Sequence, residues 1–142
     1  MSSYLPVRHF AEVPQSITET MILIAEDNAE VRRMIRKLIE DIDTQILECS
    51  DGTEAIEAYE ANLPDFVLMD INMKPIDGLT AATVILSRHP EAKIIIVSRH
   101  QDARTRETAL AIGVTAFVGK DDLTPLLDLI TKKSDQVVSG SC

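Results

Sequence analysis

Basic residues are in short supply in this sequence of 142 residues. It has 14 Lys and Arg against 23 Asp and Glu, which gives a formal net charge of −9. Nonspecific binding to nucleic acid or to an anionic membrane requires a basic face. The charge balance therefore argues against both kinds of partner, and we expect no direct nucleic-acid binding and no membrane binding.

Cysteines and long apolar runs are also few. Cys49 and Cys142 are the only cysteines, which is too few for a disulfide framework and favours a reducing, cytoplasmic location. No apolar run exceeds the length of a strand, so no transmembrane helix is predicted. The first twenty residues contain Pro6 and Pro14 and no continuous apolar segment, which is not the pattern of a secretory signal.

Short apolar runs alternate with segments of helical periodicity five times along the chain. After the first run, apolar residues recur at spacings of three, one and three, which is one face of an amphipathic helix. The predicted strands are 21–25, 45–49, 66–69, 93–97 and 116–119. The predicted helices are 31–42, 53–62 with Thr53 as N-cap, 78–88, 102–113 with Gly113 as C-cap, and a last helix carrying Leu123, Leu126, Leu127 and Ile130.

This alternation predicts an α/β fold, a doubly wound parallel sheet of five strands with helices on both faces. The length suits a single domain, which we place at residues 21–133. An N-terminal extension, 1–20, and a C-terminal tail, 134–142, flank the predicted domain.

Polar residues stand at the ends of four predicted strands. Glu26 and Asp27 follow the first, Asp70 the third, Ser98 the fourth and Lys120 the fifth. Ligands of open parallel sheets bind beyond the carboxyl ends of the strands. Three carboxylates, one hydroxyl and one ammonium are therefore expected to meet at one edge of the sheet.

Three clustered carboxylates repel one another, and a divalent cation relieves that repulsion. Mg²⁺ prefers oxygen ligands and often takes one or two carboxylates together with phosphate oxygens. Glu26 and Asp27 fit as its ligands, with Asp70 as a third. The acidic pair also has an ordinary interpretation, because acidic and amide residues are common where a helix begins.

Asp70 fits a chemical role, since a carboxylate can attack phosphorus and form an aspartyl phosphate. Phosphoryl transfer depends mainly on neutralising the charge of the phosphoryl oxygens. Mg²⁺, the Lys120 ammonium and the Ser98 hydroxyl would do this. Lys120 alone could be a surface lysine and Ser98 alone a turn residue, but chance does not explain the whole set.

Four segments together resemble the signatures of bacterial two-component receiver domains. They are residues 22–28 (ILIAEDN), 67–73 (VLMDINM), 95–98 (IIVS) and 117–120 (FVGK), with Asp77-Gly78 following the second of these segments. The resemblance covers about residues 21–133. It implies a flavodoxin-like strand order, 2-1-3-4-5.

The resemblance also assigns roles to single residues. It makes Asp70 the phosphoacceptor and Glu26 and Asp27 the metal acids, with the backbone carbonyl of Asn72 as a further Mg²⁺ ligand. Ser98 and Lys120 would bind the phosphoryl group. Ser98 and Phe117, which occupies the family's aromatic position, would form the switch.

The same resemblance implies partners. The phosphoryl donor would be a sensor histidine kinase or a phosphotransfer protein. The surface of the fourth helix, fifth strand and fifth helix would bind a downstream protein or a second copy of the chain. Such a domain catalyses only its own phosphorylation and dephosphorylation and turns over no separate substrate.

Three positions depart from the family pattern. Lys74 stands where proline is usual, with Pro75 next, and the bulky Arg99 follows Ser98 where a small residue is usual. Asp121 stands in place of the proline that commonly follows the lysine in a cis peptide bond, as in some receivers of helix-turn-helix regulators. A cis bond before a residue other than proline costs about 3 kcal/mol, so a trans bond is predicted here.

Two alternatives stay open. An aspartate-nucleophile phosphatase of the haloacid dehalogenase type would need a second Asp where this chain has Asn72, and a cap domain. A receiver-like interaction module that is never phosphorylated is compatible with Arg99 beside the site. The chain itself could be a stand-alone receiver or the receiver part of a longer regulator.

Overall fold

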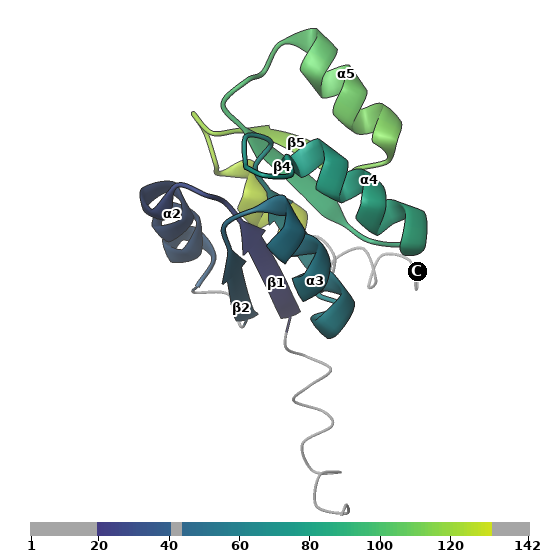
Figure 1. Ribbon diagram of the computed structural model, residues 1–142. Coiled ribbons are helices and arrows are strands. Elements are labelled where there is room, and N and C mark those ends of the chain that lie inside the picture. The colour runs from purple at the N-terminus through teal and green to yellow at the C-terminus, as the bar shows by residue number, and fades with distance from the viewer. Residues whose placement is uncertain (1–19, 41–43, 132–142) are drawn as a thin grey trace, which may run out of the picture.

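The chain folds around one parallel sheet of five strands, described here from a computed structural model that covers residues 20–40 and 44–131 (Figure 1). The strands are β1 (Thr20–Ala25), β2 (Thr44–Cys49), β3 (Phe66–Met69), β4 (Ile94–Ser98) and β5 (Ala116–Gly119). Their order is β2-β1-β3-β4-β5, and every neighbouring pair is parallel. The predicted fold class and strand order are confirmed.

The helices fall on both faces of the sheet (Figure 1). They are α2 (Ala29–Ile39), α3 (Gly52–Asn62), α4 (Gly78–Arg88), α5 (Ala103–Ile112) and a last helix over residues 125–131. α3, α4 and α5 contribute side chains to one core cluster, and α2 and the last helix contribute to the other. Every residue of β3 and β4 is buried, which explains why these strands are apolar apart from Ser98, the last residue of β4.

Several predicted boundaries change. Thr53 is not the N-cap of α3: that helix begins at Gly52, and the Asp51 side chain caps it by accepting a hydrogen bond of 2.9 Å from the Glu54 amide. Thr20, assigned to the extension, begins β1. Leu123 precedes the last helix. α5 has the predicted C-cap, Gly113, and Asp102, predicted as its first residue, is its N-cap.

Some predictions fall on residues that the structure does not describe. α2 ends at Ile39 with Glu40 as its C-cap, and the predicted helix end at Ile42 lies outside the described residues. Residues 1–19 of the predicted extension and all of the predicted tail also lie outside them. Of the described helices, none is long and apolar enough to cross a membrane.

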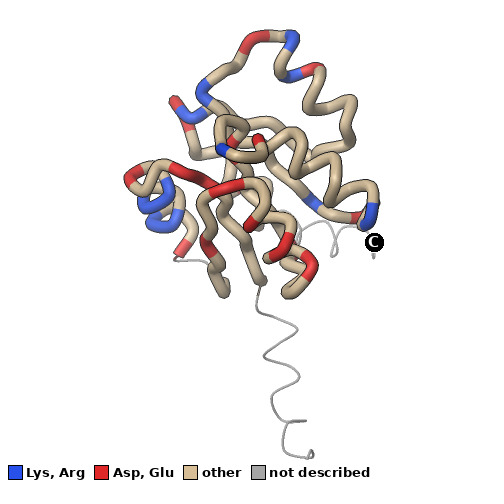
Figure 2. The backbone as a smooth tube through the Cα atoms, viewed as in Figure 1, with Lys and Arg blue, Asp and Glu red and all other residues tan. Residues whose placement is uncertain are grey.

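Basic residues cluster on α2, whereas the charged residues of α3 are acidic (Figure 2). Two of the α2 arginines are paired with one carboxylate on β2. Arg32 Nε lies 3.0 Å from Glu48 Oε1, and Arg36 donates to the other oxygen of the same carboxylate. This pairing partly neutralises the main basic segment of a chain with a net charge of −9.

Candidate functional site

The polar residues predicted at the strand ends lie together at the carboxyl edge of the sheet. Parallel-sheet hydrogen bonding continues one residue beyond three strands and holds their backbones in place. The Glu26 amide donates to the Cys49 carbonyl at 3.0 Å, and the Asp70 amide donates to the Ala25 carbonyl at 2.9 Å. The Lys120 amide donates to the Ser98 carbonyl at 2.9 Å. The site is therefore attached to rigid strands, with its side chains on the residues that leave them.

The centre of the site is an ion-paired group of buried side chains. Glu26 is 1% exposed and Asp70 3% exposed, in a chain whose other buried side chains are almost all apolar. The Lys120 ammonium lies 3.0 Å from Glu26 Oε1 and 3.1 Å from Asp70 Oδ1. One cation thus compensates two buried carboxylates, which leaves a net negative charge at the site.

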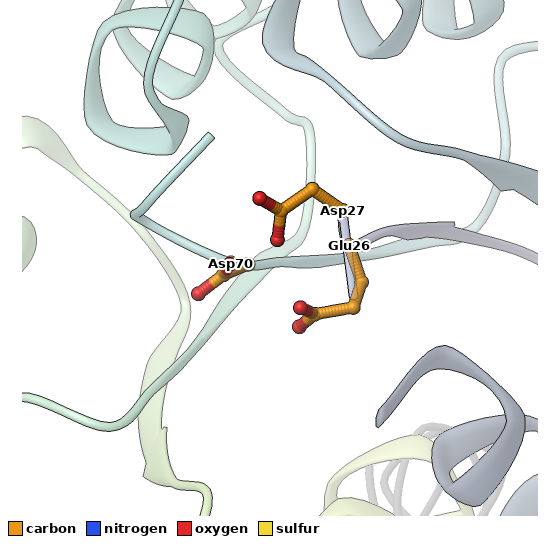
Figure 3. A group of neighbouring side chains, drawn as sticks. All are labelled: Glu26, Asp27 and Asp70. Carbon is orange, nitrogen blue, oxygen red and sulfur yellow. The ribbon is translucent and has the colours of Figure 1, made fainter. Parts of the chain in front are cut away.

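Asp27 completes a carboxylate cluster with Glu26 and Asp70 (Figure 3). One oxygen of each residue lies within 4.8 Å of the others, and Asp27 is exposed to solvent. Burial raises the pKa of the Glu26 carboxyl above its ordinary value. The hydrogen bond from Lys120 opposes this rise, and the negative charge of Asp70 adds to it. The cluster is therefore electrostatically unfavourable for carboxylates.

One oxygen in the cluster has no hydrogen-bond donor. Glu26 Oε1 is buried and accepts no hydrogen bond from the described residues. The Lys120 ammonium is close to it but makes its hydrogen bond, 3.3 Å, to the other oxygen, Oε2. A buried oxygen held only by an ion pair, beside an exposed carboxylate and a net negative charge, fits a divalent cation with oxygen ligands.

A pocket of about 290 Å³ opens over this cluster. Its walls include five of the predicted metal or phosphoryl residues and the two residues that follow Ser98. The lining residues are Glu26, Asp27, Asn28, Asp70, Asn72, Arg99, His100 and Lys120. Arg99 therefore stands at the pocket wall, and the predicted Glu26, Asp27, Asp70, Asn72 and Lys120 share one concave site.

Two predicted residues, Ser98 and Phe117, do not line the pocket. Ser98 is fully buried, is not among the lining residues, and its Oγ accepts a hydrogen bond of 3.0 Å from the His100 amide. Phe117, on β5, packs partly buried against the α3–α4–α5 core cluster. The Arg106 guanidinium carbon of α5 lies 4.8 Å from the centre of the Phe117 ring, a cation–π contact that sequence reasoning missed.

The peptide bonds around the site also bear on the departures from the family pattern. Lys74–Pro75 is the only cis peptide bond among the described residues. The Lys120–Asp121 bond is therefore trans, as predicted for a lysine that no proline follows.

Comparison with known proteins covers nearly all of the described chain. Residues 22–131 match the family model of the response regulator receiver domain. The chain is 33% identical over 100 residues to a chemotaxis protein CheY from Listeria monocytogenes, which covers 70% of this chain and 84% of that one. Its fold is similar to that of a LuxR-family DNA-binding response regulator from Staphylococcus aureus, with 31% identity, a TM-score of 0.74, and 80% of this chain and 97% of the other covered.

A longer protein named as an enzyme also contains a similar segment. A protein-glutamate methylesterase/protein-glutamine glutaminase from Carboxydothermus hydrogenoformans is 34% identical over 116 residues, which cover 80% of this chain and 33% of the enzyme. The similarity is therefore limited to a third of that enzyme's length.

Proposed function

This chain belongs to the response regulator receiver family, and we propose that it is a signalling switch that accepts a phosphoryl group on Asp70. The observation that carries the proposal is the Asp70 carboxylate itself, which lines the pocket with an ammonium 3.1 Å away. A carboxylate with ordinary structural duties would not need a buried position in a pocket shared with two other acids.

The proposed step is an in-line displacement at phosphorus. An Asp70 carboxylate oxygen attacks, a new P–O bond forms, and the bond from phosphorus to the donor breaks. The leaving group keeps that electron pair, and it is an imidazole nitrogen if a histidine kinase or phosphotransfer protein is the donor. Lys120 Nζ then pairs with a phosphoryl oxygen, and the Ser98 hydroxyl donates a hydrogen bond to another.

Glu26, Asp27, Asp70 and the Asn72 backbone carbonyl would hold Mg²⁺. Bound there, Mg²⁺ supplies positive charge for the carboxylates and for the phosphoryl oxygens. Lys120 already neutralises part of the same charge through its ion pairs with Glu26 and Asp70. The chain's own contribution is therefore a cationic group that is in place before a phosphoryl group arrives. The backbone bonds of the strand ends keep the donor atoms in place.

The experiment that tests the function is incubation with a small phosphodonor, acetyl phosphate, and Mg²⁺. We expect one phosphoryl group to be added to the intact protein and to persist for a measurable time. A phosphatase would instead release phosphate continuously without accumulating label. An interaction module that is never phosphorylated would do neither, and either of these results would contradict the proposal.

Mg²⁺ should raise the thermal stability of the unphosphorylated protein, because it binds the native carboxylate cluster and not the unfolded chain. At ten times the dissociation constant the gain is about 1.4 kcal/mol. Asp27→Asn should remove most of the gain. Glu30→Gln is the matched control, since Glu30 is an exposed acid of α2 outside the cluster. Identical melting curves with and without millimolar Mg²⁺ would count against the metal site.

We also propose that the output surface is made by α5, β5 and the last helix. Ala109 is the only fully buried residue of α5, so little apolar packing holds this helix in place. Movement of the Ser98 hydroxyl toward a phosphoryl group would open space that Phe117 could enter, which would release its contact with Arg106. Phosphorylation would thereby shift a population between two arrangements.

Beryllofluoride, a phosphoryl mimic, should therefore change amide exchange between residues 102 and 131 as well as around Asp70. The reason is that α5 lacks large apolar anchors and packs against β5, where Phe117 lies. Asp70→Asn provides the control, since the mimic needs the carboxylate. Changes confined to the loop after Asp70 would place the output elsewhere.

A further inference from the structure

A side-chain hydrogen bond connects the two loops that flank the pocket on the β4 and β5 side. Gln101 Nε2 donates to Asp121 Oδ1 at 3.0 Å. Gln101 lies between β4 and α5, directly after the pocket residues Arg99 and His100, and Asp121 directly follows Lys120. We call this pair the Gln101–Asp121 latch.

Gly119 makes room for the latch. A Cβ atom at Gly119 would lie 2.3 Å from Gln101 Oε1 and 2.7 Å from Asp121 Oδ1. Both side chains of the latch therefore pass directly over the Gly119 backbone. Gly119 is also the β5 residue that pairs with Ser98 in the sheet, so the latch crosses the sheet at the level of the site.

Each residue of the latch is next in sequence to a residue that takes part in the site: Gln101 follows His100, and Asp121 follows Lys120. His100, beside Gln101, donates its amide hydrogen to Ser98 Oγ at 3.0 Å. This donation occupies an acceptor site of the hydroxyl and leaves its own proton free to be donated. Lys120, beside Asp121, has its ammonium 3.1 Å from Asp70 Oδ1.

We infer that Gln101 and Asp121 are positioning residues that hold the Ser98 hydroxyl and the Lys120 ammonium together in the geometry that a phosphoryl group on Asp70 requires. This inference rests on the proposed function. The latch would restrain the loop after Lys120 at the position where proline is usual in the family and where this chain has Asp121. Preorganised donors lower the barrier of phosphoryl transfer because they need no rearrangement during the reaction.

The test is a reciprocal exchange of the two side chains. Gln101→Glu places two carboxylates against each other, and Asp121→Ala removes the acceptor. Each should slow labelling by acetyl phosphate about threefold or more, as expected for loss of one hydrogen bond.

The double variant Gln101→Glu/Asp121→Asn restores a donor and an acceptor in reversed order and should recover most of the labelling rate. Glu107→Ala controls for charge, since Glu107 is an exposed acid of α5 with no hydrogen bond or ion pair to the part of the chain that the structure describes.

Amide exchange of the unphosphorylated protein measures the latch without any phosphodonor. Gln101→Glu should weaken protection of the His100 amide, and the double variant should restore it. Gly119→Ala, which displaces the Gln101 side-chain end, should act like Gln101→Glu in both measurements.

The outcomes separate the two proposals. If the wild-type protein is not labelled, the proposed function is wrong and the inference fails with it. If the wild type is labelled but the latch variants label at its rate, or the double variant stays as slow as the singles, the inference alone is overturned.

Discussion

Asp70→Asn should leave the protein folded and abolish its labelling by a phosphodonor. The amide has nearly the same shape as the carboxylate but is not a nucleophile toward phosphorus, so no aspartyl phosphate can form at this position. Folding should survive because the change removes one of three crowded negative charges. Lys120 keeps its ion pair with Glu26, 3.0 Å away.

The measurement is the intact mass after incubation with acetyl phosphate and Mg²⁺, with circular dichroism as the check on folding. Asp77→Asn is the matched control, because Asp77 lies in the same loop, caps α4 and does not line the pocket. An amide can still serve as an N-cap, so the control should fold and label normally. Undiminished labelling of the Asp70→Asn protein would refute the assignment of the phosphoacceptor.

Gly78→Ala should cause the largest loss of stability of any single methyl added near the site. A Cβ atom at Gly78 would lie 1.9 Å from the Asp70 carbonyl oxygen and 2.9 Å from Met69 Cγ. The Gly78 amide also donates to the Ile71 carbonyl at 2.8 Å, which ties the start of α4 to the loop after Asp70. The new methyl therefore meets backbone, and either α4 or the Asp70 loop must move.

Two effects oppose each other in this substitution, and their sizes decide whether the free energy of unfolding rises or falls. Alanine favours a helix over glycine by about 1 kcal/mol, whereas overpacking of a tight contact costs about 1–3 kcal/mol and occasionally more. Because the clash is with backbone that cannot rotate away, we expect the free energy of unfolding to fall by about 2 kcal/mol or more. Labelling by acetyl phosphate should fall as well, since the Asp70 backbone shifts.

Urea unfolding curves of Gly78→Ala and Gly119→Ala compare a methyl group that meets backbone with one that meets side chains. At Gly119 the added methyl would meet the movable end of the Gln101 side chain, so its effect on stability should be small. Equal stability of Gly78→Ala and the wild type would show that the start of α4 lies farther from Asp70 than described.

Sequence alone determined the architecture and the chemistry available to the site. The continuous apolar runs are buried strands, their alternation with amphipathic segments requires a parallel sheet, and parallel strands place their carboxyl ends at one edge. Glu26, Asp70, Ser98 and Lys120 could therefore be gathered before any distance was known. Local signals of helix ends were weaker: Gly113 was identified, but Asp51 caps the helix assigned to Thr53.

Only the tertiary structure decided how these groups are used. The Lys120 ion pairs with Glu26 and Asp70 and the Arg106–Phe117 contact all join separate segments. The same holds for the Gln101–Asp121 latch over Gly119 and for the contact between Gly78 and the Asp70 carbonyl. Hydrophobic periodicity specifies which face of an element is buried. It carries no information on side-chain rotamers or on the exact distances between segments that meet only after the sheet has formed. Those rotamers and distances set the ion pairs, hydrogen bonds and clashes.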